Sequence, residues 1–108
     1  KLLYMQIFKK KSLTSISPSE AQLIKAMQLL GDPTRYKIFR MLMVKDEMCV
    51  SDIAKELDVT LLAVSQHFRQ FELVGLVGKE RMGQKICYML DDDNDLVRDL
   101  VAMLKERK

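Results

Sequence analysis

The sequence contains few of the residues on which enzymes depend. Its 108 residues include one histidine, two cysteines and four glycines, and no tryptophan. It has no glycine-rich phosphate-binding loop and no carboxylate pair suited to acid–base work, and one histidine alone leaves little for nucleophilic catalysis. We therefore expect a protein that is not an enzyme.

The few cysteines and the short apolar runs also bear on location. Two cysteines, Cys49 and Cys87, are too few for a disulfide framework and are typical of a reducing compartment. No apolar run approaches the roughly 18 residues of a membrane span. The apolar segment LLYMQIF precedes the basic run KKK, which reverses the order found in a secretion signal. These features predict a cytoplasmic protein that does not enter a membrane.

The charge of the chain is unevenly distributed, although the net value is only +3. Residues 1–45 carry +7, residues 46–73 carry −4, residues 74–90 carry +2 and residues 91–108 carry −2. Hydrophobic residues make up 48% of the chain, enough for the core of one domain. Attraction to a phosphate backbone must therefore come mainly from outside residues 46–73.

Residues 50–73 predict two short helices joined by a tight turn. Ser51 and Thr60 are suited to cap the two helix starts, and Asp58 tolerates the left-handed conformation that such a turn often needs. The apolar positions that recur at helical spacing are Val50, Ile53, Ala54 and Leu57, then Leu61, Val64, Phe68 and Phe71. This segment is predicted to be a helix-turn-helix with one buried face on each helix.

Signals on both sides of this segment complete the predicted fold. A helix should begin near Ser17-Pro18-Ser19 and end at Gly31, and Asp32-Pro33 should open the next. Residues 76–77 and 86–90 have strand composition with Gly83 at the bend. The run Asp91-Asp92-Asp93-Asn94-Asp95 should cap a last helix, and its acids complement the helix dipole. The prediction is a mainly α fold with a β-hairpin wing, a winged helix-turn-helix of about five helices and two strands. Residues 1–18 form a lead-in and residues 19–107 a single domain.

Four segments carry a resemblance to a known family. LGDPTRYKIFRML, EMCVSDIAKELDVT, VSQHFRQFELVGLV and RMGQKICYML resemble the ArsR/SmtB family of bacterial and archaeal repressors. The resemblance implies a homodimer that binds an imperfect palindrome in double-stranded DNA near a promoter and leaves it when an inducer arrives. The expected partners are double-stranded DNA and a second copy of the chain.

The predicted DNA contacts lie on the second reading helix and on the hairpin. Gln66 can pair with adenine, Arg69 with guanine or a phosphate, and Leu62 can touch a thymine methyl group. His67 matches the family pattern, but a histidine beside an apolar face is more often a packing residue. The full set is Thr60, Leu62, Ser65, Gln66, His67 and Arg69 on the helix and Lys79, Arg81, Gln84 and Lys85 on the hairpin. The alternative is a solvated helix face and a tip that is charged only for solubility.

The first and last helices are the expected dimer layer. The residues predicted to be buried between subunits are Leu23, Met27, Leu100 and Leu104. A protein-interaction module that has lost DNA binding is the alternative function, because residues 50–73 are acidic and their second helix begins with Leu61-Leu62, where members of the family often carry polar residues.

The signal that such a repressor senses is left open by the sequence. Metal-sensing relatives carry two cysteines before the reading helices, whereas this chain has Cys49 and then Ser51, and its last helix has no histidine. Soft metals prefer two or more thiolates, so a metal cofactor is disfavoured and no metal ligand is predicted. A thiol switch at Cys49, alone or with Cys87, is one alternative, although nothing in the pattern places Cys87 near Cys49. An unknown inducer, or none, is the other.

Overall fold

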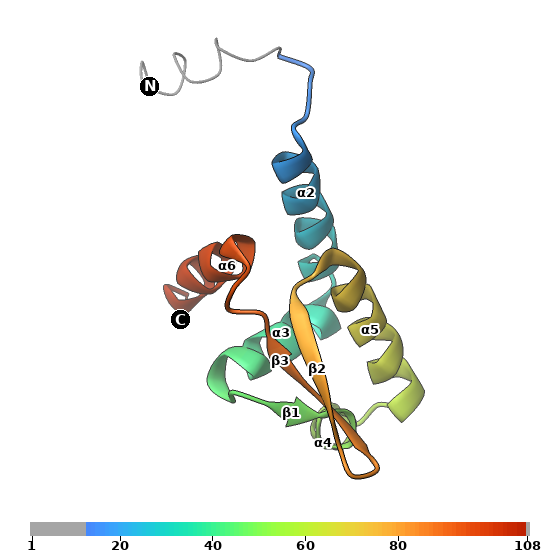
Figure 1. The fold of residues 1–108 in the computed structure, drawn as a ribbon. Helices are drawn as coiled ribbons and strands as arrows, with labels where there is room; N and C mark the ends of the chain where they lie inside the picture. The colour runs from blue at the N-terminus through green and yellow to red at the C-terminus, as the bar shows by residue number, and fades with distance from the viewer. Residues whose placement is uncertain (1–12, 108) are drawn as a thin grey trace.

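The elements of the chain follow the order of a winged helix-turn-helix (Figure 1). The structure is a computed structural model that describes residues 13–107. The elements are α2 (Pro18–Leu30), α3 (Pro33–Val44), β1 (Met48–Cys49), α4 (Val50–Leu57), α5 (Leu61–Val74), β2 (Val77–Met82), β3 (Lys85–Leu90) and α6 (Asp95–Lys105). The predicted fold class is confirmed, with one more strand than expected. The lead-in was predicted to span residues 1–18, and its first twelve residues lie outside the described part.

Side-chain caps fix most of the helix starts. Ser17 and Glu20 form a reciprocal capping box at α2, and the Asp32 carboxylate accepts from the Arg35 amide at 3.0 Å. The predicted Ser51 cap is wrong, because α4 begins after Cys49, whose side chain makes no cap hydrogen bond. The last helix is capped by Asn94, which belongs to the predicted capping run 91–95. The local signals thus located the helices better than they identified each capping residue.

The turn between α4 and α5 has the predicted left-handed residue. Asp58 has φ 54°, and it is the one non-glycine residue with positive φ among residues 13–107. The α5 helix ends in the same way at Gly75, where φ is 80°. Asp58 therefore forms the turn within the reading unit, which is the helix-turn-helix made of α4 and α5, and Gly75 ends its second helix, as the sequence predicted.

The sheet differs from the prediction in two ways. The hairpin strands are longer than expected, because the segment around the bend continues the pairing from Val77↔Leu90 as far as Met82↔Lys85. A third strand, β1, pairs antiparallel with β3 through Met48↔Tyr88 and Cys49↔Cys87, so that the strand order is β1-β3-β2. The sequence did not predict β1, because its two residues are too few to produce the alternating pattern by which strands are predicted.

One hydrophobic cluster packs the helices against the sheet. The Phe68 ring stacks on Tyr88 with centroids 3.9 Å apart and planes 2° apart, and thus joins α5 to β3. The predicted inward residues Val64, Phe68 and Phe71 are fully buried. Leu61 was predicted to join them, but its side chain is 57% exposed, because it is the first residue of the helix and precedes the turn that meets the core.

Helices lie at both ends of the molecule (Figure 1). The α2 and α6 helices lie at the end opposite the tip of the β2–β3 hairpin, whereas α4 and the start of α5 lie toward the tip. No helix within residues 13–107 is long and apolar enough to cross a membrane.

Candidate nucleic-acid interface

The outward face of α5 is fixed by its buried face. Because Val64, Phe68 and Phe71 point into the core, the opposite side chains are held in solvent. The predicted reading residues Ser65, Gln66 and Arg69 are all exposed, as is Leu62. These four residues lie on a single helix whose rotation the core fixes, which is what a base-reading surface requires.

Two other predicted contacts on α5 have structural roles. The Thr60 hydroxyl oxygen accepts from the Ala63 amide at 3.1 Å and caps α5, which leaves its hydrogen free to be donated to a phosphate. His67 is half-buried, and burial together with the positive charge of Arg35 lowers its pKa, while Asp32 acts in the opposite direction. Since these charged neighbours belong to the start of α3, His67 lies apart from the reading face.

Glu72 holds the wing against the end of α5. Its carboxylate accepts a hydrogen bond from the Tyr88 hydroxyl at 2.7 Å and lies 3.4 Å from the Lys79 ammonium group. Burial raises the pKa of Tyr88, and the hydrogen bond to Glu72 raises it further. Lys79 therefore belongs to the base of the hairpin rather than to its tip. Sequence reasoning missed Glu72, because no local pattern shows that it faces a strand sixteen residues away.

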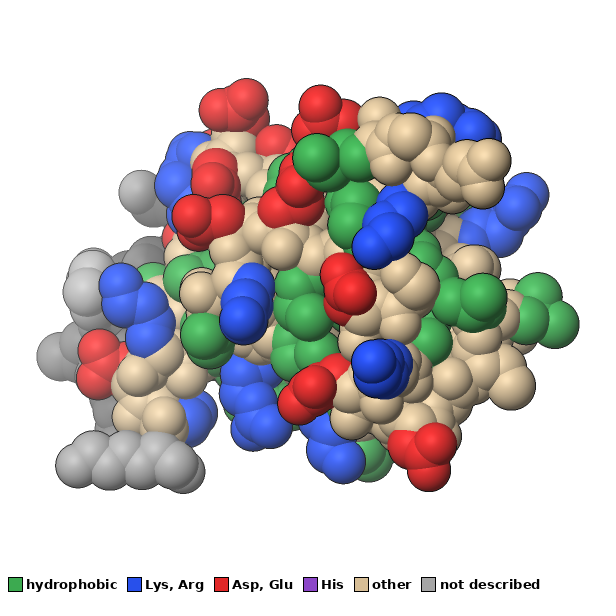
Figure 2. Space-filling model, turned by 90° about the horizontal axis from the view of Figure 1, so that it is seen from below, with side chains coloured by type: hydrophobic (Ala, Val, Ile, Leu, Met, Phe, Trp, Pro, Cys, Tyr) green, Lys and Arg blue, Asp and Glu red, His purple; other side chains and the backbone are tan. Residues whose placement is uncertain are grey.

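The tip of the wing carries the other predicted hairpin contacts. Arg81, Gln84 and Lys85 are exposed around Gly83, which has φ 67° in the turn. Seen from the tip end, Lys and Arg side chains are interspersed with acidic and apolar ones (Figure 2). The positive charge that could meet a phosphate backbone is therefore distributed between Arg69 and the wing rather than gathered in one patch.

The two cysteines are bonded to each other. Cys49 in β1 and Cys87 in β3 form a disulfide, with their Cα atoms 3.7 Å apart. The expectation that Cys87 has no reason to meet Cys49 is therefore wrong, because the unpredicted strand β1 makes them direct cross-strand partners. The bond joins the residue that precedes α4 to the inner strand of the wing.

The residues predicted for a dimer interface fall into two groups. Leu23 and Met27 on α2 are 39% and 59% exposed, and Ile24 beside them is 40% exposed. Leu100 is already buried in the chain's own core, so it cannot serve as predicted; Leu104 is half-buried. The exposed apolar side chain that α6 offers instead is Met103, at 50% exposure.

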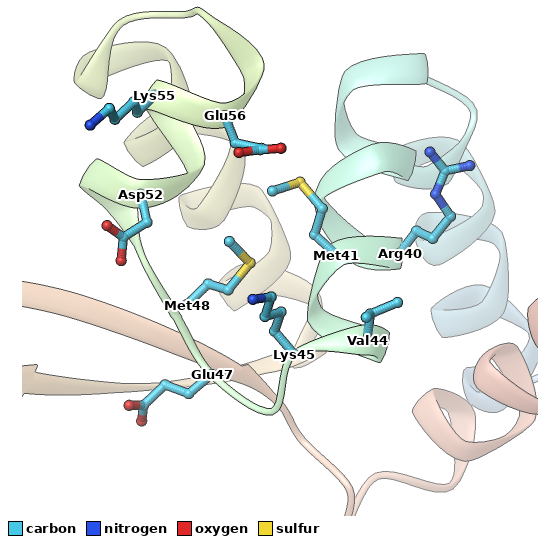
Figure 3. Close-up of a pocket in the computed structure, with 9 residues that line it drawn as sticks. All are labelled: Arg40, Met41, Val44, Lys45, Glu47, Met48, Asp52, Lys55 and Glu56. Atoms are coloured by element: carbon cyan, nitrogen blue, oxygen red, sulfur yellow. The ribbon is translucent and has the colours of Figure 1, made fainter.

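A hollow of about 770 Å³ lies between α3 and α4 (Figure 3). Its walls carry charges of both signs beside the two thioethers of Met41 and Met48. Within residues 13–107 no three histidine, cysteine or acidic side chains gather as metal ligands would. The residues that line the hollow are Arg40, Met41, Val44, Lys45, Glu47, Met48, Asp52, Lys55 and Glu56. None of them belongs to the predicted DNA-contacting set.

Comparison with known proteins agrees with this geometry. A helix-turn-helix domain family matches residues 30–79, which contain α4 and α5. The chain is 32% identical over 101 residues to the cadmium resistance transcriptional regulatory protein CadC homolog of Staphylococcus aureus, covering 92% of this chain and 80% of that protein. It is 29% identical over 104 residues to the transcriptional repressor SmtB homolog of Synechocystis sp., covering 89% and 78%.

The fold is shared with solved structures. HlyU from Vibrio cholerae N16961 superposes with a TM-score of 0.74 at 22% identity, covering 84% of this chain and 96% of HlyU. Fold, reading unit and relatives together define a helix-turn-helix transcriptional regulator that binds DNA. The chain belongs to the ArsR/SmtB family, whose members are regulators and not enzymes.

Proposed function

We propose that this protein is a homodimeric repressor that binds an imperfect palindrome and is released by an inducer or by a thiol signal. The observation that carries the proposal is the exposed apolar surface on α2 and α6, at the end opposite the start of the reading helix and the tip of the wing (Figure 1). A two-fold axis through that end would present two reading helices to two half-sites. The operator would then share the symmetry of the dimer.

The α2 surface supports dimerisation because its exposed side chains are large and apolar. Leu23 and Ile24 lie four and three residues before Met27, so both adjoin Met27 on one side of the helix. A contiguous apolar patch on a small protein marks an interaction site more often than a free surface. A second copy covers such a patch with the same patch and needs no other partner.

Light scattering with matched variants tests the dimer. The wild-type protein should have twice the 12.5 kDa chain mass at micromolar concentration. Met27→Glu should shift the mass toward that of one chain, because it places a charge in the interface. Val44→Glu is the control, since Val44 is 78% exposed on α3 and lies outside the α2 and α6 surfaces. A monomeric wild type, or equal effects of both variants, would refute the proposed interface.

The bonded cysteines support the thiol signal. Two thiols become one disulfide by losing two protons and two electrons, which a peroxide accepts as it is reduced to water. The bond would hold the wing strand to the start of α4 and so restrict the adjustment of wing and reading helix on DNA. We expect the oxidised protein to bind its operator more weakly than the reduced protein.

A comparison of redox states tests this signal. The operator affinity of the wild type should fall on peroxide treatment and recover with a dithiol reductant. Cys49→Ala should bind equally well before and after treatment, because Cys87 then has no partner in the chain. Equal affinity of the reduced and oxidised wild type would show that the inducer is of another kind.

A further inference from the structure

Two leucines stand in solvent at the start of the reading helix. Leu61 is 57% exposed and Leu62 is 67% exposed, and they directly follow the capping residue Thr60. The beginning of a recognition helix is the part that reaches base edges in the major groove. We propose that Leu61 and Leu62 select thymine by packing on its C5 methyl group in each half-site, an inference that rests on the proposed operator binding.

The position of the two leucines on the helix places them among the polar reading residues. Leu62 lies one turn before Gln66 and shares its side of α5, whereas Leu61 lies at the edge of that side, one turn before both the exposed Ser65 and the buried Val64. A helix that brings Ser65 and Gln66 to the base edges therefore brings both leucines to the same groove. Hydrophobic side chains protrude on the side of the molecule where α5 begins (Figure 2).

The chemistry of the groove offers these side chains one matching surface. Of the groups that the four base pairs present in the major groove, the thymine methyl is the one large apolar group; cytosine has only a hydrogen at C5, and the others are hydrogen-bond donors or acceptors. A leucine cannot satisfy a donor or an acceptor, so placing it over any other base edge would leave a polar group without a partner. Leu61 and Leu62 therefore favour thymine and disfavour the other three bases.

The low positive charge of the reading unit makes the contact between the leucines and thymine more important for binding. Arg69 is the only Lys or Arg in α5, and residues 46–73 carry a net charge of −4. A reading helix with so little positive charge draws less of its affinity from phosphates. Apolar contacts then account for a larger share of the binding affinity.

The experiment removes the methyl group from the DNA and its leucine partner from the protein. A duplex retained by the full chain is selected from a random pool, and each thymine of the half-sites is replaced in turn by uracil, which lacks only the methyl group. We expect one or more thymines at which the wild type binds about fourfold more weakly, the equivalent of one methyl group withdrawn from contact. In Leu61→Ala or Leu62→Ala the same replacement should have little further effect.

Leu73→Ala is the matched control. Leu73 is 81% exposed on the same helix but lies in its last turn, away from the start that enters the groove. This variant should retain the full difference between thymine and uracil. All three substitutions replace an exposed leucine of α5 with alanine, which favours the helix, so folding should be preserved.

The outcomes separate this inference from the proposed function. Selected half-sites without thymine, or an equal effect of uracil in the wild type and in both leucine variants, would overturn the inference while leaving operator binding intact. Failure of the full chain to retain any duplex at low salt would overturn both, and would indicate that the leucines serve a protein partner.

Discussion

Removal of one hydroxyl group, in Tyr88→Phe, should loosen the wing from the reading helix. The Tyr88 ring is 5% exposed and stacks on Phe68, and its hydroxyl donates to Glu72 at 2.7 Å. Phenylalanine retains the ring and the stacking and deletes only the hydrogen bond. The substitution therefore isolates the link between β3 and the end of α5.

The size of the effect follows from the exposure of the acceptor. A hydrogen bond to a charged group contributes about 1.5–3 kcal/mol to stability. The Glu72 side chain is 34% exposed, so water can replace the lost donor, and we expect a cost nearer to about 1 kcal/mol. For a domain of this size, that loss lowers the melting temperature by about 4–8 °C. Lys79→Met should cost less than about 0.5 kcal/mol, because it removes only an exposed ion pair.

Urea unfolding followed by circular dichroism measures both variants against the wild type. The expected order of stability is wild type, then Lys79→Met, then Tyr88→Phe. Binding of Tyr88→Phe to random DNA should also weaken, because a less firmly held wing contacts phosphates less well. A Tyr88→Phe midpoint equal to that of the wild type, or a larger loss in Lys79→Met, would show that Glu72 does not anchor the wing through this hydrogen bond.

Three further predictions concern reading, pH and the turn. Gln66→Ala should lose about 1–3 kcal/mol of binding free energy on the selected operator, with little change in binding to random DNA. Arg81→Ala should weaken binding to both DNAs and flatten the salt dependence by about one unit of slope. Equal losses on both DNAs for Gln66→Ala would refute the predicted reading face. Because the folded state lowers the pKa of His67 below its usual 6.5, the unfolded chain binds that proton more readily, so stability should be full above about pH 6.5 and fall as the pH decreases through the folded-state pKa. Unfolding of His67→Gln should lack that part of the pH dependence, and an unchanged profile would contradict the assignment. Asp58→Val should be less stable than Asp58→Gly by about 1–2 kcal/mol in urea unfolding, because residue 58 has φ 54°; equal stability would argue against the left-handed turn.

The sequence by itself determined the helices and the reading unit. Ser17, Asp32 and Thr60 cap helices that begin where their local pattern predicts, and Val64 and Phe68 follow the helical period into the core. These features depend on interactions between residues three or four positions apart. The outward face of α5, and with it Ser65, Gln66 and Arg69, could therefore be predicted before the tertiary structure was known.

The tertiary structure decided the features that join distant segments. Cys49 and Cys87 are 38 residues apart and meet only because a two-residue strand pairs with the wing, and Glu72 meets Tyr88 only because the hairpin folds back on α5. Leu61 continues the apolar period of its helix yet is exposed, because the buried part of α5 begins one turn after it, at Val64. Periodicity records which side of a helix is apolar, but where the core stops along that side depends on the elements packed against it.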